Sequence, residues 1–460
     1  MKNKRLSQQS AFNTRTSLSN MALTPLWMAL AMGLSLTASA TTQAQSLTEL
    51  YQAARGFDAS YQSAQSQAKA TEARGEQAKA GIWPTAGLSA GASRTNLDVV
   101  GVPDARYFGS QNVGISASQP LYRPANWANY AQGSKQVMLA EAQLNAAEQE
   151  LIIRTSQTYF DVLAAQDTLT FVQAQKAAVA EQLASAKRNF EVGTSTITDT
   201  REAQAKFDLV TAQEIAAQND VQVKQMAMDQ LVGKTGVQPK ALAVPAALPA
   251  PVPNDVNAWV AHAEAAHPSV VQARIALDIA KLETTKAEAG HLPTLDLTAS
   301  YGSNRSQGSS TSTATTRSNS GTVGLSLNLP LFAGFATQNR VKETLALEDK
   351  AQTDLDNTKR TVSQATRTAF YGVQSGLGSV KALEAAEASS QSALEANKLG
   401  YQVGVRINID VLNAQSQLFQ TKRDLAKARY DVLLGSLKLR QANGTLKAAD
   451  LAPVNAFLVK

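Results

Sequence analysis

The sequence predicts an α+β membrane protein with an internal tandem duplication, in which short segments form membrane strands and very long helices extend beyond them. Three observations lead to this prediction. The N-terminus has the pattern of an export signal, several motifs recur at a nearly constant spacing, and long coiled-coil patterns alternate with segments of alternating polarity. With 460 residues, the chain is long enough for several domains.

Residues 1–40 have the pattern of a secretory signal peptide. Basic residues precede the apolar run "MALTPLWMALAMGLSL", and small residues follow it, which predicts cleavage after Ala40 or after Ala44. Beyond Ala40 no apolar run approaches the roughly 20 residues that a membrane-spanning helix needs, so any membrane span must be built from strands. The chain has no cysteine, which excludes disulfides, thiolate chemistry and a lipid-accepting cysteine.

The chain contains two matching halves. The segment "FEVGTSTITDTREAQAKF" begins at Phe190 and "YQVGVRINIDVLNAQSQL" begins at Tyr401, an offset of 211 residues. Upstream, "AGIWPTAGLSAGAS" and "GISASQPLY" match "AGHLPTLDLTASYG" and "GLSLNLPLF" at offsets of 209 and 210 residues. The predicted division is therefore a signal peptide at 1–40, a first repeat at 41–236, a Pro-rich linker at 237–257, a second repeat at 258–446 and a C-terminal tail at 447–460.

Both halves are predicted to have the same order of elements. The expected helices lie at about 46–81, 124–191, 198–233, 255–289, 335–401 and 408–443, and the expected strands at 85–98, 110–119, 294–303 and 321–330. In the helix at 124–191, apolar residues from Val162 to Phe190 follow alternating three- and four-residue steps that only Lys176 interrupts, which indicates a coiled-coil seam. At 1.5 Å per residue this helix is about 100 Å long, far more than a globular domain needs.

The strand segments alternate apolar and polar side chains, most clearly at 294–303 and 321–330. Each has about nine to eleven residues, which suits a tilted membrane strand. The polar segment 303–321 between them suits an external loop. Alternation also occurs in sandwich edges, but the export signal and the long helices favour a barrel. Four strands cannot close a barrel with a useful lumen, and lipid does not tolerate open edges, so the chain must oligomerise.

One short motif occurs at the end of each long helix. Gly193 and Gly404 stand where the helix must turn, because glycine permits the positive φ that ends a helix. Asp199 and Asp410 lie one turn into the following helices, where an acid often serves as a cap or dipole partner. The segment "DTRE" at 199–202 has capping-box spacing, and Asn408 is a second candidate cap. In a threefold tunnel, Asp410 would be repeated around the axis at the mouth.

These motifs, in this order in both halves, closely resemble the TolC family of outer-membrane channel proteins and specifically its TolC branch. The resemblance covers about residues 46–450. It implies a homotrimer in which each protomer gives four strands to one twelve-stranded outer-membrane barrel, continuous with a periplasmic α-helical coiled-coil barrel. It also implies a mixed equatorial region at the linker 237–257 and the tail 447–460.

The resemblance implies a function and a place in the cell as well. The chain would be a passive, gated exit duct in the outer membrane of a Gram-negative bacterium, in contact with outer-membrane lipid. It would serve tripartite efflux pumps, type I secretion or both, and it would open when a periplasmic adaptor (membrane fusion) protein and an inner-membrane transporter of the RND, ABC or MFS type dock.

By resemblance, four residues match the family's gate, in which a tyrosine and an arginine of the inner helix pair bind a threonine and an aspartate of the outer pair. They are Thr198, Asp199, Tyr401 and Arg406. Charge-assisted bonds of this kind hold a closed mouth yet separate when a partner binds the open state better.

The resemblance also assigns the mouth and the tips. In a trimer Asp410 would form a ring of three carboxylates that favours cations. Asn413 stands where the branch commonly has a second aspartate, so its neutral ring should weaken cation binding. Adaptor docking is expected around Gly193 and Gly404.

The sequence shows no catalytic, cofactor or metal motif. His262 and His267 lie on different helix faces and form no ligand set with His291, and "GKTG" lacks the first glycine of a phosphate loop. Dispersed basic residues argue against nucleic-acid binding. Two alternatives to a gated duct are an ungated diffusion porin and a structural coiled-coil surface protein. A porin would not need helices of about 100 Å, and a coiled-coil protein would not need duplicated strands.

Overall fold

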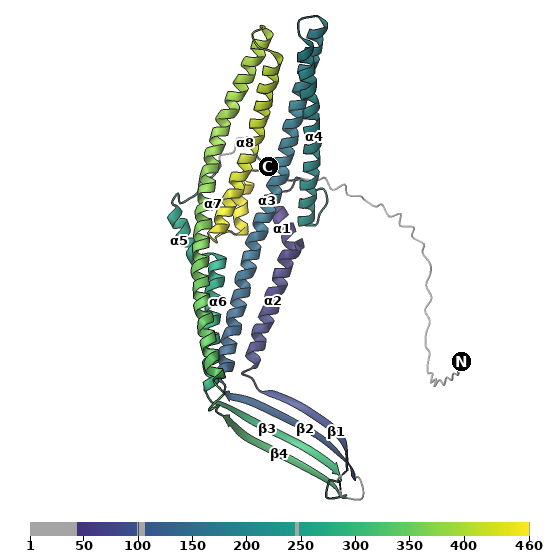
Figure 1. Ribbon diagram of the computed structural model, residues 1–460, viewed down its shortest axis with the longest axis vertical. Helices are drawn as coiled ribbons and strands as arrows, with labels where there is room; N and C mark the ends of the chain where they lie inside the picture. Colours follow the sequence, from purple (N-terminus) through teal and green to yellow (C-terminus); the bar gives the residue numbers. More distant parts are fainter. Residues whose placement is uncertain (1–43, 99, 101–105, 244–247, 460) are drawn as a thin grey trace, which may run out of the picture. The chain divides into compact units, whose positions relative to one another are not determined.

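The computed structural model describes residues 44–98, 100, 106–243 and 248–459, and the predicted signal peptide lies outside them. The chain is an α+β protein in which pairs of long helices are connected to one four-stranded sheet (Figure 1). This confirms the fold class expected from the sequence. Within the described ranges, no helix combines the length and the apolar character that crossing a membrane requires.

The same order of elements occurs twice. The first half contains α1 (Leu47–Phe57), α2 (Ala59–Ala80), β1 (Thr85–Leu97), β2 (Arg106–Tyr122), α3 (Pro124–Glu191) and α4 (Ile197–Val232). The second half contains α5 (Val256–Ala266), α6 (Pro268–Glu288), the 3₁₀ turn η1 (Ala289–His291), β3 (Thr294–Gln307), β4 (Thr315–Asn328), α7 (Ala336–Gln402) and α8 (Asn408–Ala442), followed by η2 (Ala448–Asp450) and α9 (Leu451–Asn455).

Two helices expected to be continuous are each broken. In place of one helix at 46–81, Asp58 ends α1 and caps α2, because its side chain accepts a hydrogen bond of 2.8 Å from the backbone N–H of Tyr61. The helix expected at 255–289 breaks at His267, because Pro268 disfavours helical backbone at the residue before it and suits the first position of a new helix. Both signals are local, and the Ala-rich composition around them obscures them.

The sheet brings the predicted apolar faces together. Its order is β1-β2-β3-β4, with every neighbouring pair antiparallel. The register places Leu88 opposite Ile115, which is in turn opposite Tyr301, and Ala299 opposite Val323. Because side chains alternate along a strand, this register forms one apolar face and one Ser/Thr-rich face.

Three strands are longer than the ten residues expected of each, since β2 has 17 residues and β3 and β4 have 14 each, whereas β1 with 13 residues nearly matches the expected 85–98. The polar segment 303–321 was expected to be a loop, but its first part belongs to β3 and its last part to β4, which leaves residues 308–314 as the connection. The strands continue beyond their apolar residues, because Ser and Thr side chains allow the backbone hydrogen bonds of the sheet to continue but give no hydrophobic pattern in the sequence.

The coiled-coil seam of α3 is confirmed over most of its length. Leu169 is half-buried and Phe190 is 43% exposed, and the other six apolar positions are buried: Val162, Ala165, Val172, Val179, Leu183 and Ala186. At the interruption Lys176 turns aside and its Nζ binds Glu214 of α4 at 2.7 Å. The seam packs against α4 and also against Leu412 of α8, so the two helical hairpins share a core.

The largest core lies where the two ends of the chain and the linker meet. It combines residues of α1, α3, α8 and α9 with Val237 and Leu242 of the linker. Two short bridges connect the same parts, since Gln45 pairs with Pro239 and Leu242 pairs with Leu458. The described parts of the linker and of the tail that form these contacts are therefore packed against the core.

Candidate functional site

The two hairpin turns, at the end of the long helices remote from the sheet (Figure 1), have the same backbone geometry. Gly193 has φ 79° and Gly404 has φ 81°. In each turn the residue after the glycine donates its N–H to the carbonyl of the residue four positions before the glycine, at 2.8 Å from Thr194 to Asn189 and 2.9 Å from Val405 to Gly400. The positive φ that the sequence predicted is present in both halves.

In the first half, Asp199 stabilises the start of α4. Its N–H donates to Thr196 Oγ1 at 3.2 Å, and its Oδ2 accepts from the N–H of Thr196 at 3.0 Å and from Ser195 Oγ at 2.8 Å. This is a capping box in which Thr196 is the cap. The box expected at residues 199–202 is therefore wrong by one turn, because Thr196 and not Asp199 has the extended backbone of a cap.

The protonation of Asp199 leads to a prediction. Burial alone would raise its pKa, but hydrogen bonds from Ser195 and Thr196 outweigh burial and hold the pKa below the ordinary 3.8. Since the folded-state pKa is lowered, the stabilisation is complete above the ordinary pKa and is lost as pH falls below it. Asp199→Asn should therefore speed amide hydrogen exchange in the first turn of α4 at neutral pH about fivefold, for a cap worth about 1 kcal/mol.

The difference from wild type should shrink toward zero well below pH 3.8. Asp208→Asn on the same helix is the matched control. Asp208 is exposed and, among the described residues, accepts a hydrogen bond from the Gln204 side chain alone, so the substitution should leave the exchange unchanged. A rate difference of equal size at both pH values would show that the charge of Asp199 is not what stabilises the turn.

In the second half the corresponding positions have diverged. Ile407 replaces Thr196 as the cap residue and offers no side-chain acceptor. Asp410 instead lies 3.7 Å, Oδ2 to Nη1, from Arg406, which is an ion pair across one helical turn. The Arg406 side chain lies against Gly400, which has no side chain. A Cβ added to Gly400 would lie only 2.7 Å from the Cγ of Arg406. At the position of Gly400 the first half has Asn189.

Asn408 connects the two hairpins and does not cap α8. Its side chain is fully buried, its Oδ1 accepts from Gln182 Nε2 of α3 at 2.5 Å, and its Nδ2 donates to the carbonyl oxygen of Asp199 at 3.3 Å. Asn408 was expected to be a cap, and this was wrong because it is the first residue inside the helix. In the sequence, the only sign of this link between the hairpins is that Asn408 is polar, whereas the equivalent residue of the first half is Ile197.

Tyr401 forms a second link between the hairpins. Its hydroxyl accepts a hydrogen bond from Asn189 Nδ2 at 3.3 Å, and its ring packs against the cluster of Leu394, Val411 and Leu418. Asn189 was not identified from the sequence, because a lone asparagine near a helix end carries no distinctive pattern.

The remaining predicted residues are exposed at the tips. The side chains of Thr198 and Asn413 face solvent. Across the described part of the chain, neither Tyr401 nor Arg406 hydrogen-bonds to the side chains of Thr198 or Asp199. One protomer thus places the four predicted gate residues at neighbouring tips without joining them to one another.

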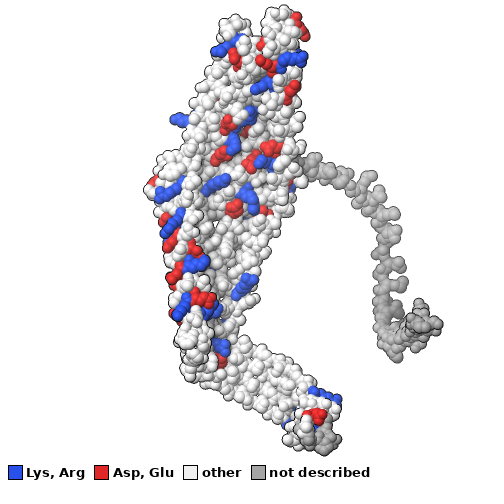
Figure 2. Space-filling view, viewed as in Figure 1, with Lys and Arg blue, Asp and Glu red and all other residues white. Residues whose placement is uncertain are grey.

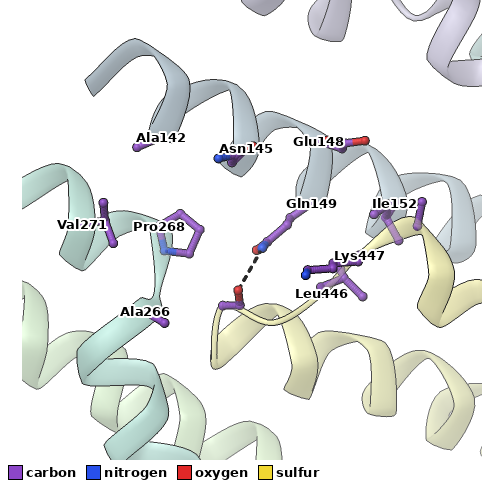
Figure 3. A pocket seen from close by; sticks show the side chains of 12 residues that line it. Ala142, Asn145, Glu148, Gln149, Ile152, Ala266, Pro268, Val271, Leu446 and Lys447 are labelled. Atoms are coloured by element: carbon purple, nitrogen blue, oxygen red, sulfur yellow. Dashed lines mark hydrogen bonds between the residues drawn. The ribbon is translucent and has the colours of Figure 1, made fainter. Parts of the chain in front are cut away.

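A cavity of about 400 Å³ lies elsewhere, between α3, the α5–α6 break and the loop after α8 (Figure 3). Gln149 crosses it to donate to the carbonyl oxygen of Gly444 at 3.3 Å. Glu148 beside it accepts from the Tyr51 hydroxyl at 2.9 Å and lies 3.5 Å from Arg55. The Gln149–Gly444 bond thus joins the two halves across the cavity, and the Glu148 contacts hold α1 against α3. Among the described residues, no group of three His, Cys, Asp or Glu side chains is placed to hold a metal.

Duplicated helical hairpins with two like turns, attached to one sheet with an apolar face, define the class of protein. The family described as outer membrane efflux protein matches residues 50–234 and 259–445, once in each half. The chain belongs to this family. It is a transport family, and its members are outer-membrane proteins.

Individual relatives narrow the assignment. The chain is 34% identical over 437 residues to "Outer membrane protein TolC" of Vibrio cholerae, which covers 95% of this chain and 98% of that protein. It is 33% identical to "Outer membrane protein TolC" of Escherichia coli K12, in a match that covers 93% of this chain and 88% of that protein. It is also 33% identical to "Alkaline protease secretion protein AprF" of Pseudomonas aeruginosa, covering 75% and 72%.

Solved structures show the same fold. The outer membrane protein VceC of Vibrio cholerae has a TM-score of 0.74 at 18% identity and covers 86% of this chain and 96% of that chain. The open state of the MtrE outer membrane channel of Neisseria gonorrhoeae has a TM-score of 0.70 at 18% identity, covering 87% and 90%. The family match and the relatives at 33–34% identity make the chain an outer-membrane exit duct of the TolC type, with its long helices on the periplasmic side.

Proposed function

We propose that three copies of this chain close one duct, with a twelve-stranded barrel in the outer membrane and the long helices around its periplasmic part. The observation that carries the proposal is the single sheet, with β1 and β4 as its edges and one apolar face. Pairing β4 of one copy with β1 of the next would remove both edges, which lipid does not tolerate. Within this proposal the repeats span 41–236 and 258–446, and the linker 237–257 and tail 447–460 lie at the equator.

The divergence of the two turns supports α7 and α8 as the moving part of a gate. At equivalent positions the first half has Phe190 and Ser195, and the second half has Tyr401 and Arg406. Tyr401 therefore supplies a phenol hydroxyl in place of the Phe190 ring, and Arg406 a guanidinium in place of the Ser195 hydroxyl. Because Thr198 and Asp199 do not bind them within one copy, a neighbouring copy would supply the expected bonds.

The exposed side chains at the two hairpin turns indicate what kind of protein docks there. Both turns expose apolar side chains, with Val192 at 72%, Val403 at 65%, Val405 at 77% and Ile407 at 60% exposure. Around Gly193 and Gly404 these residues offer a surface for the tip of a periplasmic adaptor. The adaptor would connect the duct to an inner-membrane transporter of the RND, ABC or MFS type. Membership of the outer membrane efflux family supports efflux, and the relative named for alkaline protease secretion supports type I secretion.

Deleting the gene in the bacterium that encodes it tests the export role. An exit duct removes its cargo from the cell, so deletion should raise the accumulation of ethidium or stop secretion of a type I substrate, and the wild-type gene should restore either. A diffusion porin predicts the opposite, namely slower entry and lower ethidium accumulation. Unchanged accumulation and unchanged secretion would exclude the export role.

Asp410 should set the ion selectivity of the mouth. Removing three carboxylates with Asp410→Ala should lower the cation-over-anion permeability ratio roughly twofold or more, because the ring's field favours cations. The reversal potential under a salt gradient measures this ratio. Asn413→Asp should move the ratio in the opposite direction, since it adds a second acidic ring. If both variants keep the wild-type reversal potential, these positions do not line the constriction.

A further inference from the structure

The charged residues of the sheet gather at its two ends. Asp296, near the helices, accepts two hydrogen bonds from Arg123 just before α3. The other charged residues within the four strands are arginines at the loop end: Arg94, Arg106, Arg305 and Arg317. Figure 2 shows a stretch of sheet surface without charged side chains between these ends.

Three of the four arginines lie on the apolar face. Arg305 is directly opposite Arg317 in the register, on the face that carries Tyr301 of β3 and Val323 of β4. Arg94 lies on the same face, because it follows Leu88 by an even number of residues along β1. Arg106 belongs to the other face and donates to the carbonyl oxygen of Ser310 at 2.8 Å.

Among the residues that the structure describes, no carboxylate offsets the charges of these three arginines. Like charges directly opposite on neighbouring strands are destabilising. All three side chains are exposed, and no ion pair joins any of them to another described residue. Asp98 follows β1 and is exposed too. Arg305 and Arg317 therefore present two exposed guanidinium groups on adjacent strands, a position that suits an anion bound by both.

The height of the arginines above the helices indicates which anion is within reach. From Leu295 to Arg305 the strand rises about 34 Å, and a tilt of about 45° reduces this to roughly 25 Å, the height of the apolar band of a membrane barrel. The arginines are thus at the far boundary of the hydrocarbon layer. Their apolar stems can lie along the wall while the guanidinium groups reach the lipid headgroups.

We infer that Arg94, Arg305 and Arg317 bind the phosphate groups of anionic lipids in the outer leaflet, on the lipid-facing wall of the barrel. The inference rests on the proposed barrel, which turns the apolar face toward lipid. A guanidinium presents paired N–H donors that match phosphate oxygens, and adjacent arginines fit a phosphate better than a zwitterionic headgroup. A trimer carries three such sites.

Native mass spectrometry of the full trimer in detergent tests the site with dioctanoyl phosphatidic acid as the probe. The variant Arg94→Gln, Arg305→Gln, Arg317→Gln should bind this lipid about tenfold more weakly than wild type, while uncharged dioctanoylglycerol should bind both equally. Arg106→Gln, at the same end but on the other face, should behave as wild type. Replacing the three arginines by lysine should give an intermediate affinity, because charge remains and the paired donors are lost.

Three outcomes would overturn the inference: equal affinity of the triple Gln variant and wild type, an equal loss in Arg106→Gln, or competition by inorganic phosphate at the same concentration as the lipid. Trimeric mass and unchanged channel conductance establish that each variant is folded. A wild type that binds the lipid but does not conduct would overturn the duct and leave the site in place. A wild type that conducts but does not prefer the anionic lipid would overturn the lipid site and leave the duct in place.

Discussion

Replacing Tyr401 by Phe together with Arg406 by Ser should raise the single-channel conductance several-fold in a planar bilayer. The variant converts both positions to the residues of the first half, Phe190 and Ser195, and so removes the Asn189–Tyr401 hydrogen bond and the Arg406–Asp410 ion pair. Of these two contacts only the Asn189–Tyr401 bond joins the moving hairpin to the first one. At about 1 kcal/mol per hydrogen bond, its loss in three copies lowers closed-state stability by roughly 3 kcal/mol. That is on the order of a hundredfold in the ratio of closed to open mouths.

A matched control comes from the same turn. Val405→Thr also converts a residue to its first-half counterpart, Thr194, but Val405 is 77% exposed and belongs to neither link, so the conductance should stay at the wild-type value. An intact trimer of the double variant with wild-type conductance would refute the assignment of Tyr401 and Arg406 to the gate.

Gly444→Ala should be the most destabilising single substitution among the glycine turns. Gly444 has φ 79°, and an added Cβ would lie 2.6 Å from His267 Cα and 3.0 Å from Ala266 O, which are backbone atoms that cannot yield easily. Left-handed strain and overpacking together predict a loss of about 3 kcal/mol per protomer. The measurement is the melting temperature of the trimer at fixed detergent and protein concentration.

Gly193→Ala separates the two contributions. Gly193 has the same φ of 79° but nothing within 4 Å of an added Cβ, so only strain remains, at about 1 kcal/mol. Equal melting temperatures of the two variants would mean that the loop after α8 does not hold the α5–α6 break in place.

The helices and the sheet face were predictable because their signals repeat. The apolar positions of the α3 seam recur every seven residues. Apolar residues occupy every second position of β3 and β4, and the register pairs them on one face. The breaks at Asp58 and His267 each depend on one residue, so a pattern over a window misses them. The extended strand ends depend on backbone pairing, which Ser and Thr do not reveal.

The tips were predictable as turns but not as contacts. Gly193 and Gly404 required positive φ, and the sequence predicted it. The links made by Asn408 and Asn189 join residues more than 200 positions apart, and only the packing of the α7–α8 hairpin on α3 brings them together. Gly400 is understood only once the Arg406 stem is seen to lie over it.

The decisive measurement combines light scattering and single-channel recording on one preparation of the mature wild-type protein. The expected result is a mass of three chains in detergent and a small conductance in a planar bilayer. A large conductance that the Tyr401→Phe, Arg406→Ser variant leaves unchanged would indicate an ungated porin. A monomeric mass, or a trimer that never conducts, would contradict the duct and favour a structural coiled-coil protein.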